Sequence, residues 1–262
     1  MASNVHYKQS GRIKHLATIG VVGLVAAAAL TRLLTKRAEA QHRPSGRLIE
    51  IDGETVHVID EGSGPCVVLL HGNGGMVEDF KATTLIENLA KTNRVILLDR
   101  PGFGLSTRTA KRPWTPELEA EHVSDILAHL EVRNPVIVAH SWGTLVAVAL
   151  AIRDQSAIAG LVLLSGYYYR TTRIDTVMQT PASLPLIGPL LRHTVIPLLS
   201  RLSAPLTIKH VFAPMKVPLR FLRLYSVPMA SRPSQLKSVA GHGNVAVRVS
   251  ASIMQRSTSR FA

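Results

Sequence analysis

The chain has 262 residues, a hydrophobic content of 46% and a single cysteine, Cys66. This composition excludes a disordered, collagen-like or coiled-coil protein, and one cysteine excludes both an intramolecular disulfide framework and a zinc site built from several cysteines. The formal net charge of +13 belongs to the two ends, because residues 48–165 carry −6 whereas residues 166–262 carry +12 and one acidic residue, Asp175.

Basic residues at the two ends of a chain often indicate an anionic partner. Here they form no helical stripe and no aromatic–basic RNA motif, so we expect no nucleic-acid partner. Attraction to anionic lipid headgroups is the simpler interpretation.

The first predicted element is an apolar helix. The uncharged run Leu16–Leu30 is short for the ~20 residues that span a bilayer, but Lys14 and Arg32 at its ends can extend to the headgroups. Residues 1–40 are therefore predicted to be a single-pass membrane anchor. A secretory signal cleaved at the small-x-small sequence 38–40 is the alternative and would make the protein secreted or periplasmic, although intervening basic residues disfavour cleavage. A soluble helix is a third interpretation.

From residue 48 onward, strand-like and helix-like segments alternate. Two short runs on either side of Asp52-Gly53 predict a hairpin, because this dipeptide is typical of tight turns. Continuous apolar runs, typical of strands buried on both faces of a parallel sheet, follow at residues 66–70, 95–98, 136–138 and 161–164. Helical spacing appears between them at 80–90, 118–130 and 145–152. The pattern predicts an α/β domain over residues 48–166, with a parallel-dominated sheet and a leading hairpin.

Glycine-rich loops follow three of these strands, at the sheet edge where α/β proteins place their active sites. The loops are His71-Gly72-Asn73-Gly74-Gly75, Asp99-Arg100-Pro101-Gly102-Phe103-Gly104-Leu105-Ser106 and Ala139-His140-Ser141-Trp142-Gly143. Each alone is compatible with an ordinary turn. Their occurrence in this order, each behind a buried strand, favours one shared site.

The third loop has the pattern of a nucleophile elbow, a sharp turn between a strand and a helix that exposes a serine hydroxyl. Small neighbours are required because the two backbones come close together, and Ala139 and Gly143 meet that need. We expect Ser141 to be the nucleophile and the backbone amides of Asn73 and Trp142 to stabilise a developing oxyanion.

With its HGNG, DRPGFGxS and HSWG motifs, the sequence resembles the α/β-hydrolase superfamily, in a branch found among bacterial serine hydrolases. The resemblance extends from about residue 48 to residue 240. It implies the α/β-hydrolase fold, Ser141 as nucleophile, the Asn73 and Trp142 amides as oxyanion hole, and a small ester-like substrate. The residues expected to support the motifs are His71, Gly72, Gly74, Asp99, Gly102, Gly104, His140 and Gly143. Serine at the elbow argues against the dehalogenase and epoxide-hydrolase branches, whose nucleophile is a carboxylate. We expect neither a cofactor nor a metal.

The resemblance further implies a helical cap over residues 167–240. Seven prolines between residues 181 and 218 indicate short helices, and the many apolar residues indicate a hydrophobic substrate pocket. The same apolar surface is also compatible with contact to a membrane. The tyrosines at 167–169 are expected to pack within the cap.

The superfamily pattern stops before its catalytic acid and histidine. These normally follow the strands after the cap, in the order Ser, acid, His. Here no acidic residue follows Asp175, and His242 lies between glycines without the acid-bearing strand that should precede it. Asp175 and His242 are therefore weak candidates for substitutes in the triad, and His193 and His210 are expected to be structural.

Residues 241–262 form an atypical tail, rich in Ser and Arg. The pattern predicts that the last strands are missing, that the chain is truncated or frameshifted, and that the predicted sixth strand has an unpaired edge. The expected function is esterase-like acyl transfer that is impaired because the acid and histidine are absent. The alternatives are a non-enzymatic membrane-bound binding or scaffold protein and an intact hydrolase with an atypical triad.

Overall fold

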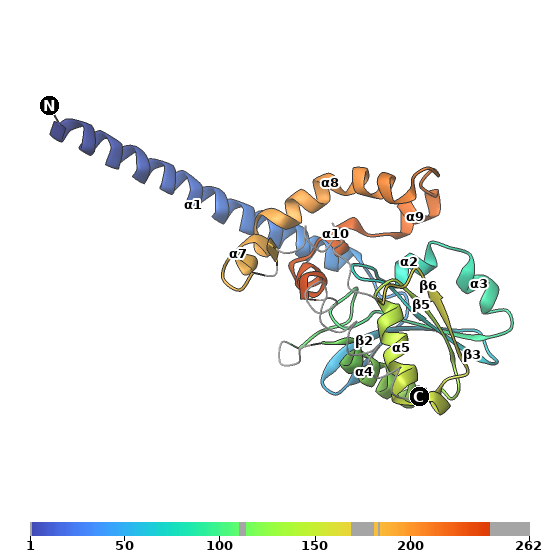
Figure 1. Cartoon of the computed structure of the whole chain (residues 1–262). Coiled ribbons are helices and arrows are strands. Elements are labelled where there is room, and N and C mark those ends of the chain that lie inside the picture. Colours follow the sequence, from blue (N-terminus) through green and yellow to red (C-terminus); the bar gives the residue numbers. More distant parts are fainter. Residues whose placement is uncertain (1, 110–113, 169–180, 183, 242–262) are drawn as a thin grey trace.

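The computed structural model describes residues 2–109, 114–168, 181–182 and 184–241 of the chain (Figure 1). Asp175, His242 and nearly all of the predicted tail lie outside the described residues. The strands are β1 (Arg47–Ile51), β2 (Glu54–Glu61), β3 (Cys66–Leu70), β4 (Arg94–Leu98), β5 (Val136–His140) and β6 (Gly160–Leu164). The helices are α1 (Ala2–Gln41), α2 (Val77–Lys81), α3 (Leu85–Leu89), α4 (Pro116–His129), α5 (Gly143–Arg153), the 3-10 turn η1 (Gln155–Ala157), α7 (Ile187–His193), α8 (Val195–Phe212), α9 (Leu219–Leu224) and α10 (Val227–Ala230).

The strands form one sheet in the order β1-β2-β4-β3-β5-β6. The predicted hairpin is confirmed, because β1 and β2 pair antiparallel around a turn in which Asp52 and Gly53 have φ values of 52° and 77°. Strand β2 is antiparallel to β4, whereas β4, β3, β5 and β6 are mutually parallel. The chain leaves β3 for β4 on one side and then places β5 on the other, which creates a switch point at the carboxyl end of β3.

Alternating side chains cover both faces of the sheet. Val68 and Leu70 belong to a core cluster with α4 and α5, whereas Val67 and Leu69 pack into a second cluster with α2 and α3. This period-two division explains why the strands are continuous apolar runs.

Two predicted elements differ from the structure. The helix expected at residues 80–90 is two short helices, because Thr83 Oγ1 donates to Phe80 O at 2.7 Å and accepts from Leu85 N at 3.1 Å, which ends α2 and begins α3. The predicted burial of β6 on both faces is wrong, since Leu164 is 41% exposed. Within the described residues β6 pairs with β5 and lies at the edge of the sheet, as expected.

Helices α8 and α9 arch over the sheet end near α2, where the cap was predicted (Figure 1). Helix α8 has 18 residues with Pro205 inside it, so it is longer than the proline content indicated. A further helical turn over residues 233–241 follows α10. The cap boundaries at 167 and 240 remain predictions.

Helix α1 has 40 residues and extends away from the rest of the molecule (Figure 1). Its segment Lys14–Gln41 is long and apolar enough to cross a membrane or to be a signal sequence. The end nearest the core packs against α7, α8 and α10.

Candidate active site

Ser141 lies on the turn that joins β5 to α5, with a φ of 52°. Left-handed backbone is costly for a residue with a side chain, so the surrounding contacts must hold it in place. Its amide donates to Leu164 O at 2.9 Å, and its carbonyl accepts from Thr144 N at 3.0 Å and from Thr144 Oγ1 at 2.6 Å. The turn therefore has the backbone geometry that the elbow motif predicted.

Glycines allow the neighbouring loops to approach this turn. A Cβ on Gly143 would lie 2.7 Å from Leu70 O, and a Cβ on Gly72 would lie 3.0 Å from Ser141 Cβ. The loop after β3 consequently lies against the elbow. Trp142 is the N-cap residue of α5 and is 1% exposed, so its amide lies at the positive end of the helix.

His71 is a structural residue of the loop after β3. Its Nδ1 lies 2.8 Å from Gly72 O, and its Nε2 lies 2.9 Å from the amide nitrogen of Arg100. Nδ1 must donate to the carbonyl and Nε2 must accept from the amide, which defines a neutral imidazole with its proton on Nδ1. Both nitrogens are engaged, so this histidine does not provide a general base.

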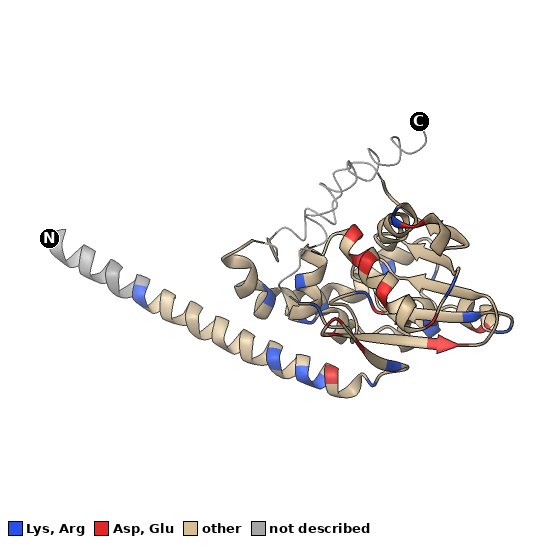
Figure 2. Cartoon of the chain, turned by 90° about the horizontal axis from the view of Figure 1, so that it is seen from below, with Lys and Arg blue, Asp and Glu red and all other residues tan. Residues whose placement is uncertain are grey.

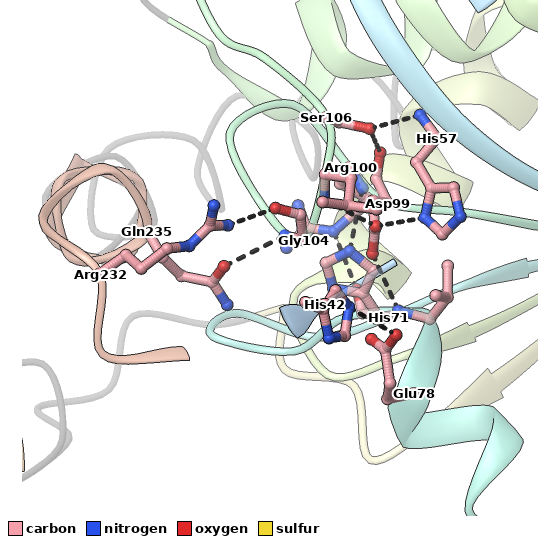
Figure 3. A network of polar contacts seen from close by, with 12 residues as sticks. His42, His57, His71, Glu78, Asp99, Arg100, Gly104, Ser106, Arg232 and Gln235 are labelled. Carbon is pink, nitrogen blue, oxygen red and sulfur yellow. Dashed lines mark hydrogen bonds and ion pairs between the residues drawn. The ribbon is translucent and has the colours of Figure 1, made fainter. Parts of the chain in front are cut away.

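Asp99 organises the loop after β4 (Figure 3). Its carboxylate is 1% exposed and accepts from His57 Nδ1 at 2.7 Å, from Val77 N at 2.9 Å and from Leu105 N at 3.0 Å. A Cβ on Gly104, whose φ is 50°, would lie 2.0 Å from this carboxylate. Asp99 and the loop glycines therefore fold the motif around a buried carboxylate and not around a substrate.

Gly102 and Gly74 have positive φ values of 81° and 77°. A Cβ on Gly102 would come within 2.2 Å of Ser238 Oγ, so this glycine allows the helical residues 233–241 to approach. His140 precedes the elbow, and its partial burial lowers the pKa of its imidazole. The imidazole is consequently neutral at pH 7.

Hydrogen bonds from Arg232 and Gln235 link the last helical residues of the cap to the loops after β3 and β4 (Figure 3). The Gln235 side chain accepts from Gly104 N at 3.1 Å and donates to Gly74 O at 3.3 Å, while Arg232 donates to Gly104 O. The sequence patterns gave no role for these two residues. A buried glutamine with two distant backbone partners has no local signature.

The loop after β3, α2, α8 and α9 enclose a pocket of about 660 Å³ beside the elbow. His140 and Leu164, at the ends of β5 and β6, also line it. Asn73 lines this pocket too, and its side-chain nitrogen donates to Val239 O at 3.2 Å. Within the described part of the chain, no group of three or more His, Cys, Asp or Glu side chains is placed to hold a metal ion.

The structure brings the three motif loops together at the switch point of the sheet. Within the described residues, the Ser141 hydroxyl makes no hydrogen bond to a histidine or a carboxylate. The two weak triad candidates, Asp175 and His242, lie outside the described residues. A parallel sheet with a leading hairpin, a strained serine turn and a helical cap defines the class of α/β hydrolases.

Comparison with known proteins agrees with this class. The α/β-hydrolase fold family matches residues 65–194. A 2-hydroxymuconate semialdehyde hydrolase from Pseudomonas sp. strain CF600 is 34% identical over 120 residues, which cover 45% of this chain and 42% of that protein. Haloalkane dehalogenase 2 of Mycobacterium tuberculosis is 25% identical over 141 residues, which cover 54% of this chain and 48% of that protein. The chain thus spans about half the length of the curated relatives it matches.

Solved structures show the same fold. A haloalkane dehalogenase from Agrobacterium tumefaciens superposes with a TM-score of 0.63 at 18% identity, covering 81% of this chain and 73% of that one. An esterase from Thermogutta terrifontis superposes with a TM-score of 0.58 at 21% identity, covering 78% and 73%. The chain belongs to the α/β-hydrolase superfamily.

Proposed function

We propose that this α/β hydrolase uses Ser141 as the nucleophile of acyl transfer on an ester or related carbonyl in a small apolar molecule. The observation that supports it is the strained backbone of Ser141 at the switch point, held by Leu164 and Thr144. Serine in this position forms an acyl-enzyme, whereas the alkyl-enzyme esters of dehalogenases require a carboxylate. The dehalogenase relatives therefore share this chain's fold but not its proposed chemistry.

In the proposed reaction, the Ser141 oxygen attacks the carbonyl carbon and the carbonyl electrons move onto oxygen. The amides of Asn73 and Trp142 stabilise that oxyanion, and collapse of the tetrahedral intermediate expels the alcohol as its oxygen is protonated. Water then attacks the acyl-serine, which releases the acid and restores Ser141. Each step requires a group that moves a proton.

We further propose that this acyl transfer is impaired in the chain. Among the described histidines near the motif loops, His71 uses both ring nitrogens and His57 is bound to the buried Asp99. His140 precedes Ser141 and lines the pocket, but within the described residues it makes no hydrogen bond to the Ser141 hydroxyl. Without a base the serine remains an ordinary alcohol, and oxyanion stabilisation by itself leaves a residual rate enhancement of about 10³–10⁴ over water.

Labelling with a fluorophosphonate probe tests this proposal. We expect the full chain to label at least about 10³-fold more slowly than an intact serine hydrolase, with the residual signal lost in Ser141→Ala. Slow labelling that is equal in both proteins would exclude Ser141 as the nucleophile. Rapid stoichiometric labelling of the full chain would show that a functional base is present and would overturn the impairment.

A second candidate function is binding without chemistry, as a membrane-bound binding or scaffold protein. It is favoured by the combination of a pocket of about 660 Å³ with a serine whose hydroxyl, within the described residues, makes no hydrogen bond to a histidine. Equal ester turnover in the full chain and Ser141→Ala, together with retained ligand binding, would support this function over acyl transfer.

We propose that α1 is an uncleaved membrane anchor. Its uncharged stretch has basic residues at both ends (Figure 2), and residues 14–30 measure about 25 Å as a helix, close to a hydrocarbon core of about 30 Å. Thr31 is 2% exposed and donates to Thr194 O at 3.1 Å, and Ala38 is 4% exposed. Cleavage at residues 38–40 would remove these packed residues from the core, so retention of α1 is favoured.

A further inference from the structure

The pocket beside the elbow has a continuous aromatic wall on the cap side. Phe212 of α8 meets Phe221 of α9 edge to face, with ring centroids 4.9 Å apart, and Phe221 stacks on Tyr225 at 4.8 Å with an interplanar angle of 13°. All three rings line the pocket. The wall therefore suits an apolar or aromatic body.

Two hydrogen-bond acceptors on the core side of the same pocket lack a donor. Oδ1 of Asn73 and Oδ1 of Asp79 are both buried, and neither has a hydrogen-bond partner among the described residues. The orientation of the Asn73 amide is set by the bond from its nitrogen to Val239 O. Buried acceptors without donors are rare in folded proteins, so each calls for an explanation such as water or a ligand.

The loop after β3 leaves space for the carboxyl group of Asp79. A Cβ on Gly75 would lie 2.3 Å from Asp79 Oδ2, so only glycine leaves room for this carboxyl group. The loop that supplies the proposed oxyanion donor Asn73 thus also makes space for the carboxyl group of Asp79, which lines the same pocket.

The electrostatic environment disfavours an anionic ligand. Neither Lys nor Arg is among the described residues that line the pocket. Burial and the nearby carboxylates of Glu78 and Asp99 raise the pKa of Asp79 to about 7, and burial with the carboxylates of Asp79 and Glu78 raises the pKa of Tyr225. A carboxylate placed here would meet acceptors and negative charge without a compensating cation.

We propose that this pocket is a subsite for an apolar substrate that ends in a hydrogen-bond donor, a hydroxyl or an amine, held by the side-chain oxygens of Asn73 and Asp79. The subsite rests on the proposed function, because it deepens the substrate class of the site beside Ser141. The donor end bonds the two acceptors while the apolar body lies along the rings of Phe212, Phe221 and Tyr225. Above about pH 7, where Asp79 is ionised, the same arrangement disfavours an acidic end group, so the comparison with an acidic ligand is made at pH 8.

Direct binding of four matched probes tests the subsite: phenylbutanol, its methyl ether, phenylbutylamine and phenylbutyrate. The full chain in detergent carries Ser141→Ala, so failure of the serine chemistry leaves this measurement unaffected. We expect the alcohol and the amine to bind at least about tenfold more tightly than phenylbutyrate, and the alcohol about fivefold more tightly than the ether, which has no donor. Equal affinity of alcohol and ether, or phenylbutyrate as the tightest ligand, would overturn the proposal.

Variants of the pocket residues test which side chain causes the preference for ligands with a hydrogen-bond donor. Asp79→Leu is expected to abolish the preference for alcohol over ether, whereas Thr207→Val is the matched control, because Thr207 lines the pocket but its hydroxyl already donates to Ser203 O at 3.1 Å. Asp79→Asn retains an acceptor oxygen, so it should preserve alcohol binding and weaken amine binding about fivefold at pH 8. If Asp79→Leu does not fold, the ratio of amine affinity to alcohol affinity in Asp79→Asn is the deciding measurement. A ratio equal to that of the chain with Asp79 would overturn the role of this residue.

Discussion

At the scale of single residues, the motifs contain two kinds of side chain that look alike in the sequence. His71 and Asp99 hold the loops together through buried hydrogen bonds, whereas Ser141 is half-buried and is held in a strained backbone conformation. The sequence located all three positions. It assigned Ser141 as the expected nucleophile and His71 and Asp99 as supporting residues, but it did not give their hydrogen-bond partners, which come from other segments of the chain.

Asp79 lines the pocket, and its protonation also affects the free energy of unfolding. Burial and the carboxylates of Glu78 and Asp99 raise its pKa to about 7, above the ordinary value of 3.8. The folded protein therefore binds this proton more tightly than the unfolded chain does. Its contribution to stability is fully present below about pH 4 and is lost as the pH rises through about 7.

Asp79→Asn should therefore stabilise the protein at high pH and have little effect at low pH. We expect the free energy of unfolding of the variant to exceed that of the unaltered chain by on the order of 2 kcal/mol at pH 8. Urea unfolding in detergent at pH 4.5 and pH 8 measures this difference. A difference that is the same at both pH values would contradict a raised pKa.

At the scale of elements, the site depends on helix α4 although α4 contributes no predicted catalytic residue. Arg100, in the loop after β4, forms an ion pair with Glu119 of α4 at 2.6 Å, and both side chains are fully buried. The same guanidinium donates to His71 O at 2.9 Å and to Gly72 O at 3.0 Å. One cation thus connects α4 to the loops after β3 and β4.

Arg100→Leu is expected to destabilise the fold by about 3–5 kcal/mol, because it removes the buried guanidinium that pairs with the buried Glu119 carboxylate. Arg153→Leu is the matched control: its pair with Glu121 also joins α5 to α4, but the atoms are 3.9 Å apart and exposed, so its removal should cost less than about 1 kcal/mol. Chemical unfolding of the two variants measures both values, and similar losses would show that burial of the first pair is not what matters.

At this scale the sequence predicted the position and type of α4 and α5 because their apolar spacing is regular. The single helix expected at residues 80–90 is interrupted by a pair of hydrogen bonds from Thr83, which apolar spacing does not record. The length of α8 was also underestimated. Prolines in a sequence predict breaks in a helix, but α8 continues through Pro205.

At the scale of the whole molecule, α1 has two parts with different environments. Leu16, Val22 and Val25 are each more than 60% exposed, whereas the end nearest the core is tied to it. His42 bonds Glu78 at 3.0 Å, and Glu39 bonds Arg232 at 3.1 Å. The first part suits a bilayer, and the second belongs to the hydrolase domain.

Two truncations separate these parts. A chain lacking residues 1–30 should leave the membrane fraction on carbonate extraction and retain a thermal unfolding midpoint within a few degrees of that of the full chain. A chain lacking residues 1–42 should unfold at a clearly lower temperature, since it loses the buried contacts of Thr31 and Ala38 and the pairs of Glu39 and His42. Equal midpoints for both truncations would show that the packed end of α1 is not part of the domain.

The sequence by itself determined the class of fold, the hairpin, the order of strands and helices, and the serine on its turn. These follow from local patterns: continuous apolar runs for the strands, period-3.6 apolar spacing for the helices, and glycines where backbones must approach closely. The tertiary structure decided that His71 is neutral and engaged, that Gln235 joins two loops more than 100 residues away, and that Asn73 and Asp79 share a pocket with cap aromatics. Those outcomes depend on contacts between distant segments, and the same side chain is structural or reactive according to the partners that folding brings to it.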